Sequence, residues 1–206
     1  MNTSRPLIIE PIALDPDALE RPIDVAKMFG NDNPLEIEIG SGKGTFITEQ
    51  ARARPEINFI GIEWARFYWR YTCDRLRRHN CLNARATRVE AAFFLDEFIP
   101  PESVSVLHIY FPDPWPKARH HKRRLVQEAF MPKVMRVLKS GGRLQVVTDH
   151  ANYWETIEPT VRNSPLSVID YNRPGSAKEG EFVGTNFERK YAREGRPFYA
   201  IAALKK

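Results

Sequence analysis

The fold is decided by residues 35–44, which have the sequence LEIEIGSGKG. The first five residues alternate aliphatic and acidic side chains, a pattern that predicts a short strand. The glycines that follow allow the backbone to turn tightly, and a helix is predicted from Thr45 to about Arg54 because Pro55 stops it. A glycine-rich turn between a strand and a helix indicates an open α/β sheet with a ligand site beside its first strand.

The rest of the chain continues this alternation of strands and helices. Further strands are predicted at residues 58–63, 84–89, 104–111 and 143–148, and further helices at residues 65–79, 122–138 and 152–161. Two final strands, at 166–171 and 198–204, close the chain with a long loop between them. This order predicts a doubly wound α/β sheet with right-handed crossovers in one domain, residues 34–206. Residues 1–33, which are rich in Pro, Asp and Asn, are predicted to form an extended N-terminal arm.

Composition limits the class of protein. With 206 residues, 42% of them hydrophobic, the chain is large enough for one domain with a packed core, and its net charge of +5 favours an anionic partner. The longest strongly apolar stretch, 198–204, is far shorter than the roughly 20 residues that span a bilayer, and no signal peptide is recognisable. Two cysteines provide neither a disulfide framework nor a four-ligand zinc site. We therefore expect a cytoplasmic monomer or homodimer that needs neither membrane nor metal.

The glycine-rich turn favours a nucleotide-type ligand. Ligands of such sheets bind at the carboxyl ends of the strands, where Glu63 would accept hydrogen bonds from ribose hydroxyls. A P-loop is excluded because Lys43 is followed by Gly44, and the dinucleotide fingerprint requires one more residue between its last two glycines. Glu38, two residues before the turn, suits a ligand that carries an ammonium group. A nicotinamide enzyme and a purely structural turn remain open alternatives.

A second segment, residues 112–124, has the sequence PDPWPKARHHKRR. Its prolines stiffen the loop and fix the direction of Asp113 and Trp115, which makes it a candidate active site or else a kinked connection. The cations that follow are either a track for phosphates or a solvated face. The helix at 65–79 interleaves arginines with aromatic residues; its arginines extend the basic surface, and its aromatics are expected in the core. His108 lies within a strand and is also expected in the core.

These segments resemble the tRNA (guanine-N7-)-methyltransferase family in its bacterial single-subunit form. The resemblance extends from Pro34 to the C-terminus and rests on EIGSGKG at 38–44, GIE at 61–63, residues 112–124, and TNFE at 185–188 followed by Lys190 and Gly195. It implies a class I methyltransferase fold, Rossmann-like, with a mostly parallel seven-stranded sheet whose last strand is antiparallel. It also implies methyl transfer from S-adenosylmethionine to N7 of a guanine in the tRNA variable loop, with S-adenosylhomocysteine as product.

The resemblance further implies roles for individual residues. The expected catalytic residue is Asp113. The cofactor is expected to bind to Glu38, Gly40, Gly42, Gly44, Glu63 and Glu90, and the substrate to Lys117, Asp149, Thr185, Asn186, Phe187 and Glu188. The RNA is expected to contact Arg119, His120, His121, Lys122, Arg123 and Arg124. Glu90 departs from the family, which usually has Asp there, and Trp115 either stacks on the target base or is structural. Two other functions stay open: a tRNA-binding protein without activity, and a methyltransferase that acts on protein or a small metabolite.

Overall fold

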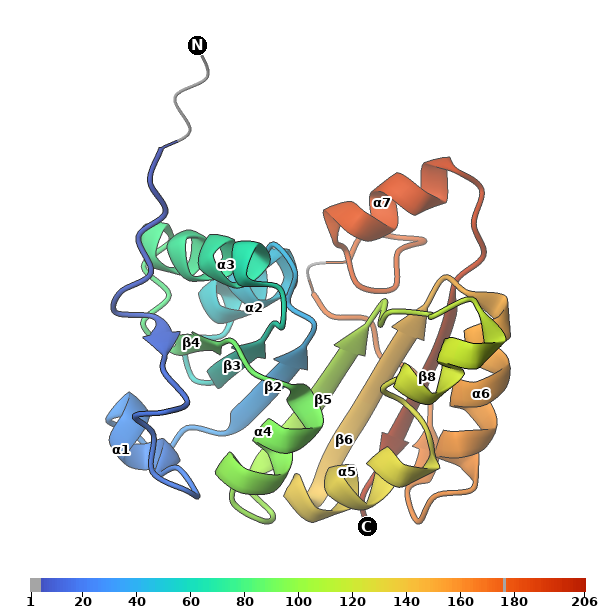
Figure 1. Cartoon of the computed structure of the whole chain (residues 1–206), viewed down its shortest axis with the longest axis horizontal. Coiled ribbons are helices and arrows are strands. Elements are labelled where there is room, and N and C mark those ends of the chain that lie inside the picture. Colours follow the sequence, from blue (N-terminus) through green and yellow to red (C-terminus); the bar gives the residue numbers. More distant parts are fainter. Residues whose placement is uncertain (1–4, 176) are drawn as a thin grey trace.

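The computed structural model describes residues 5–175 and 177–206. These residues form one eight-stranded sheet in the order β1-β4-β3-β2-β5-β6-β8-β7, shown in Figure 1. The strands are β1 (Ala13–Leu14), β2 (Leu35–Ile39), β3 (Asn58–Ile62), β4 (Ala84–Thr87), β5 (Val104–Tyr110), β6 (Leu138–Thr148), β7 (Ser167–Ile169) and β8 (Tyr199–Leu204). All neighbours from β1 to β6 are parallel, and β8 runs antiparallel to both β6 and β7. The predicted fold class, with its antiparallel last strand, is confirmed.

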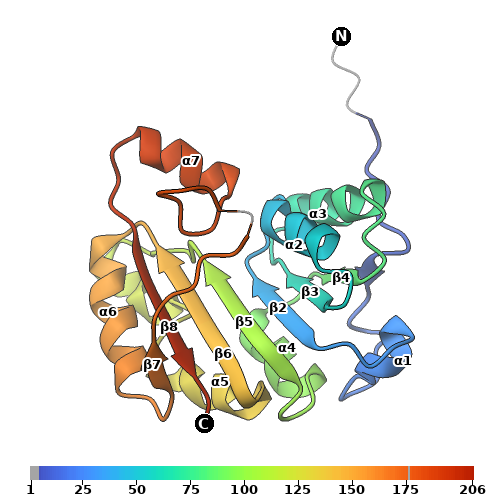
Figure 2. The same cartoon turned by 180° about the vertical axis from the view of Figure 1, so that it is seen from behind.

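The helices cover both faces of the sheet. They are α1 (Val25–Phe29), α2 (Thr45–Ala53), α3 (Arg66–Arg78), α4 (Ala91–Phe98), α5 (Met131–Val137), α6 (Ala151–Arg162) and α7 (Asn186–Arg193), with the 3₁₀ helices η1 (Ala118–Arg123) and η2 (Glu128–Phe130). Helices α4, α5 and α6 pack in one apolar cluster, and α2 and α3 pack in another. Figures 1 and 2 show these two groups on opposite faces of the sheet. The central strands β2 and β3 are therefore buried along their whole length.

The N-terminal arm is more structured than an extended segment. Its strand β1 pairs with β4 and adds an eighth strand at the edge of the sheet, where seven strands were expected. Ile12 and Ile23 are buried against the domain, and the backbone N–H of Ile23 donates to the carbonyl of Phe98. The arm thus covers the open edge next to β4, a feature that its Pro-rich composition does not indicate.

Several helical assignments differ from the sequence prediction. Residues 122–138 do not form one helix, because only the part that begins at Met131 is α-helical and Pro132 lies in its first turn. Helices α1, α4 and α7 were not predicted. Helix α4 is short and apolar, without a clear 3.6-residue period, whereas α7 carries a recognisable start signal, since Thr185 caps it by accepting the N–H of Glu188.

Candidate active site at the carboxyl end of the sheet

The turn after β2 has the open backbone that a closely bound ligand requires. Gly40, Gly42 and Gly44 have φ angles of +78°, +53° and +66°, in the left-handed region that favours glycine. A Cβ atom on Gly40 would meet no atom within 4 Å, and one on Gly42 only the Gly40 carbonyl at 3.9 Å. On Gly44, by contrast, it would lie 2.8 Å from the side chain of Thr72. The first two glycines therefore border free space, and the third allows the turn to pack against α3.

Glu38 places a buried carboxyl group beside this turn. Its Oε2 atom is buried without a hydrogen-bond partner, and so is the hydroxyl of Ser41. Burial raises the pKa of Glu38 to about 8, with the charge of Glu63 adding to the effect, although the backbone N–H of Ile47 donates to its carboxylate. A buried group of this kind is stabilised by a cation. The two unpartnered oxygens thus fit the ammonium end of a ligand seated against the glycines.

Two further carboxylates from the cofactor prediction lie at the ends of the next strands. Glu63, after β3, accepts the backbone N–H of Gly42 at 2.8 Å and that of Ala65 at 2.8 Å, which fixes the turn against β3. Glu90, after β4, caps α4 by accepting the N–H groups of Ala92 and Phe93. Each carboxylate oxygen has a second lone pair that can accept from a ligand hydroxyl or amine. The carboxylates of Glu38 and Glu63, together with the open turn, therefore fit S-adenosylmethionine, which carries an ammonium group and ribose hydroxyls.

The loop after β5 has a constrained backbone and is fixed to helix α6 by Arg124. Phe111 and Trp115 have positive φ angles of 53° and 43°, and Asp113 between them is exposed. Arg124 fixes the loop, because its Nε donates to the Pro114 carbonyl at 2.9 Å and its remaining nitrogens donate to Asn152 and Thr156 of α6. Its guanidinium also lies 4.8 Å from the ring centre of Tyr153. Asp113 is therefore presented to solvent by a loop that is anchored to α6.

The basic run separates into surface residues and one buried residue. Arg119, Lys122 and Arg123 are exposed, and His120 and His121 are half-buried. Arg124 differs from the sequence prediction of an RNA contact, since it is only 3% exposed and its guanidinium binds the loop and α6. Trp115 is half-buried, with the guanidinium of Arg123 4.9 Å from its ring centre and the His120 ring at 5.9 Å.

The predicted substrate residues near α7 also divide by burial. Phe187 is 44% exposed, whereas Glu188 is 2% exposed and accepts the backbone N–H groups of residues 182–184. Glu188 therefore shapes the loop before α7 and does not present its carboxylate at the surface. Asn186 begins α7, and its side chain lies outside the described residues. Lys117 is exposed.

Asp149, at the end of β6, forms an ion pair with Arg196 at 2.8 Å. The described residues contain no group of three or more His, Cys, Asp or Glu side chains placed to hold a metal ion. Within the same part of the chain, every helix is too short or too polar to cross a membrane.

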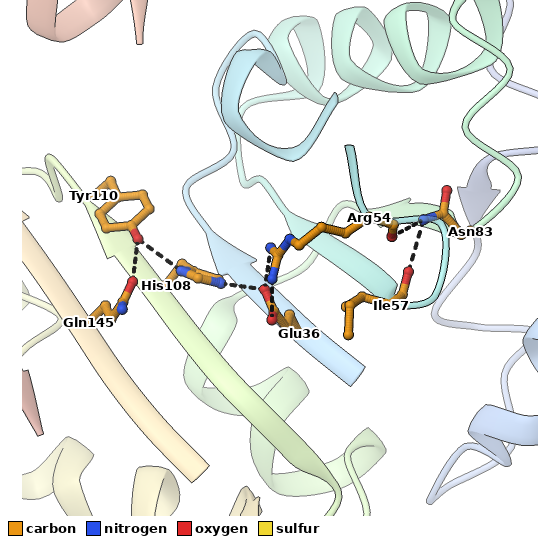
Figure 3. A network of polar contacts seen from close by, with 7 residues as sticks. All are labelled: Glu36, Arg54, Ile57, Asn83, His108, Tyr110 and Gln145. Atoms are coloured by element: carbon orange, nitrogen blue, oxygen red, sulfur yellow. Dashed lines mark hydrogen bonds and ion pairs between the residues drawn. The ribbon is translucent and has the colours of Figure 1, made fainter. Parts of the chain in front are cut away.

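Sequence reasoning missed a buried polar network beneath this edge, drawn in Figure 3. Glu36 accepts two hydrogen bonds of 2.7 Å from Arg54, and its carboxylate lies 2.9 Å from Nε2 of His108. Nδ1 of His108 contacts the hydroxyl of Tyr110, which donates to Gln145. Burial opposes ionisation of Glu36, yet His108 and Arg54 together lower its pKa to about 2. The prediction that His108 belongs to the core is confirmed, since it is 4% exposed.

The chain is similar to known methyltransferases in sequence and in structure. A family model described as "Putative methyltransferase" matches residues 32–201. The tRNA (guanine-N(7)-)-methyltransferase of Rhodopirellula baltica is 38% identical over 93% of this chain and 73% of its own length, and that of Myxococcus xanthus is 35% identical over 98% of each. The protein of the same name from Syntrophotalea carbinolica is 42% identical over 71% of this chain. The matched region covers 63% of that relative's length.

Solved structures support the fold. A structure titled as an antibiotic-related methyltransferase matches with a TM-score of 0.62 at 16% identity, over 87% of this chain and 92% of that chain. The 30S ribosomal A1408 methyltransferase from an uncultured bacterium matches with a TM-score of 0.59 at 16% identity, over 89% of this chain and 95% of that chain. At this identity the likeness shows the class I methyltransferase fold alone.

Proposed function

Because the chain belongs to the tRNA (guanine-N(7)-)-methyltransferase family, we propose that it transfers a methyl group from S-adenosylmethionine to N7 of a guanine in tRNA. The products are 7-methylguanosine in the RNA and S-adenosylhomocysteine, and the target lies in the variable loop. The observation that carries this proposal is the buried Glu38 carboxyl, one oxygen of which has no hydrogen-bond partner, beside an open glycine turn. This turn after β2 lies at the same edge of the sheet as the loop after β5 that carries Asp113.

Each of the proposed cofactor residues binds a different part of S-adenosylmethionine. Glu38 pairs with the ammonium group of the methionine part, and the absence of side chains at Gly40 and Gly42 lets the ligand approach the backbone. Glu63 accepts from the ribose hydroxyls while it still holds the turn through the N–H of Gly42. Glu90 accepts from the adenosine part with the lone pairs that its capping role leaves free.

The chemistry requires little proton transfer. Bound S-adenosylmethionine supplies an electrophilic methyl group on a positively charged sulfur. N7 of guanine carries an unprotonated lone pair, so no general base is needed to prepare it. Positive charge appears on the purine as the methyl arrives, and the Asp113 carboxylate stabilises that charge and accepts from N1–H and the exocyclic amine. The rigid loop around Asp113 holds the base in line with the methyl group.

The exposed cations beside this loop bind the RNA backbone. Lys117, Arg119, Lys122 and Arg123 are all exposed and lie within seven positions of the chain. Each phosphate that they neutralise steepens the salt dependence of binding by roughly 0.7–0.9 in log–log slope. The protein acts on tRNA in the cytoplasm, as a monomer or a homodimer, and its reaction uses no metal ion.

The test is product identification. Purified protein is incubated with unmodified tRNA and methyl-labelled S-adenosylmethionine, and the RNA is digested to nucleosides. We expect the label in 7-methylguanosine, with turnover strongly reduced in Asp113→Asn and cofactor affinity unchanged. Asp32→Asn, an exposed acid before β2, is the matched control and should behave like wild type. Cofactor and tRNA binding without label in 7-methylguanosine would refute the proposed reaction, and would leave a tRNA-binding protein without this activity.

A further inference from the structure

Exposed aromatic side chains gather at one end of the molecule. Among the described residues, the exposed large aromatics are Trp64 at 67%, Phe67 at 63%, Tyr68 at 42%, Phe93 at 43% and Phe187 at 44%. All five lie where a chain segment leaves the carboxyl end of the sheet: after β3, in the first turns of α3 and α4, and in the first turn of α7. Other exposed large apolar residues in this part of the chain, such as Leu82 and Val168, are aliphatic and lie elsewhere.

The aromatic residues of α3 have two different environments, although the sequence predicted a core position for all of them. Trp69 packs against the α2–α3 cluster and donates its indole N–H to the Ala86 carbonyl at 3.1 Å. Phe67 and Tyr68 remain outside, with ring centres 5.5 Å apart in an edge-to-face arrangement. We call Trp64, Phe67 and Tyr68 the aromatic platform. These rings do not pack in the core, and a group of exposed apolar side chains of this kind is typical of a binding surface.

The surroundings of the aromatic platform are cationic. Arg66, which lies between Trp64 and Phe67 in the sequence, is exposed. Arg88 donates to the Trp64 carbonyl, and its guanidinium lies 5.9 Å from the Trp64 ring centre. The acid on α3, Asp74, is 1% exposed and is already paired with arginines, including Arg5. Exposed rings next to exposed cations are the combination that binds single-stranded nucleic acid, because bases stack on the rings and phosphates pair with the cations.

The aromatic platform also lies beside the proposed site. It begins directly after Glu63, and Figures 1 and 2 both show the start of α3 as the end nearer to α7. A methyltransferase that acts on a stacked guanine must first remove it from its stack, at a cost of a few kcal/mol. The bases next to that guanine then lose a stacking partner. Rings at the rim of the site can replace this partner.

We infer that the aromatic platform binds unpaired bases of the tRNA substrate by stacking, with Arg66 and Arg88 on the adjoining phosphates. This inference rests on the proposed function and adds a second RNA contact, separate from the basic run at Arg119–Arg123. It assigns Phe67 and Tyr68 to RNA affinity and to neither the cofactor nor the fold.

The experiment measures tRNA affinity at several salt concentrations, together with cofactor affinity by calorimetry, for full-length variants. Phe67→Ala and Tyr68→Ala should each weaken tRNA binding about 10-fold, in the range of one stacked base, without a change in the salt slope. Phe67→Leu, which stays apolar but has no ring, should lose as much, and Phe67→Trp should restore binding. Arg66→Gln should instead reduce the salt slope by roughly 0.7–0.9. Leu82→Ala, an exposed apolar residue before β4, is the control that should change nothing.

Each contrary result has a distinct meaning. Wild-type affinity for tRNA in Phe67→Ala and Tyr68→Ala would overturn the inference and leave the proposed function intact. An equal loss of cofactor affinity would assign the rings to the cofactor, and a change of sedimentation would assign them to contact between copies of the chain; either overturns the inference. Failure of the wild-type protein to bind tRNA would remove the proposed function together with this contact.

Discussion

Cofactor binding should expel a proton from Glu38. The pKa of this buried carboxyl is about 8 in the free protein, so at pH 7 it is about nine-tenths neutral. An ammonium ligand requires the ionised form, and the proton must therefore leave on binding. The apparent affinity at pH 7 is then about 10-fold below its limiting value, and at pH 6 about 100-fold below it. Below about pH 8, the affinity for the cofactor therefore rises with pH.

The same group makes the free protein less stable at neutral pH. The unfolded chain loses this proton near the ordinary value of 4.5, whereas the folded chain keeps it up to about 8. Stability therefore falls as pH rises between these two values, and at pH 7 the loss is about 3 kcal/mol. Glu38→Gln, which is neutral at every pH, should recover most of that stability and abolish the pH dependence of affinity.

Calorimetry of S-adenosylmethionine binding in buffers of different ionisation enthalpy measures the proton directly. We expect release of about 0.9 proton at pH 7 and less as the pH rises toward 8. Glu38→Gln should release none from this site and bind the cofactor weakly. Thermal unfolding from pH 5 to pH 9 supplies the second readout. Binding without proton release at pH 7, together with unfolding that is independent of pH in wild type, would refute the assignment of a neutral Glu38.

Three further changes test other parts of the structure. Glu36 has a pKa of about 2, against an ordinary 4.5, so its ion pairs contribute about 3 kcal/mol of stability that is present above pH 4.5 and lost as the pH falls toward 2. In Glu36→Gln, the melting temperature should therefore fall less steeply with decreasing pH in this range than in wild type. An unchanged pH dependence would contradict this. Arg124→Met leaves buried acceptors without donors, so the free energy of unfolding should fall by about 3 kcal/mol. The turnover of tRNA should also fall, because the Asp113 loop loses its anchor, while cofactor affinity is retained. Gly44→Ala should lower stability by about 1–3 kcal/mol because its Cβ meets Thr72, whereas Gly30→Ala, at a similar φ with free space, should cost less.

The sequence predicted the elements whose chemistry is local. The strand, turn and helix at residues 35–54 follow from glycine positions and a proline stop, and all three appear in the structure within one residue of the prediction. Helix α4 was missed because apolar residues occupy most of its short sequence, AAFFLDEF, which leaves no clear amphipathic period. Strand β1 was missed because two residues carry no detectable pattern, and the pairing with β4 depends on the tertiary fold.

The roles of charged residues in the site were harder to predict for a physical reason. Arg124 and Glu188 both belong to motifs that a family resemblance connects with substrate, yet each is buried and binds backbone groups of a loop. A charged group in such a position stabilises the conformation of that loop by about 1.5–3 kcal/mol per hydrogen bond. Composition does not distinguish this position from an exposed one, since neighbouring cations at Arg123 and Arg124 have the same chemistry and opposite environments.

This distinction gives the two kinds of residue different signatures. A side chain that contacts the tRNA, such as exposed Arg119, changes affinity and its salt dependence without changing the free energy of unfolding. A side chain that holds a loop lowers stability as well, because its loss leaves buried backbone groups without partners. Glu63 combines both roles, since it binds the N–H of Gly42 and lies at the proposed ribose position. Its substitution by Gln should therefore weaken cofactor binding and destabilise the free protein together, whereas Arg119→Gln should affect RNA binding alone.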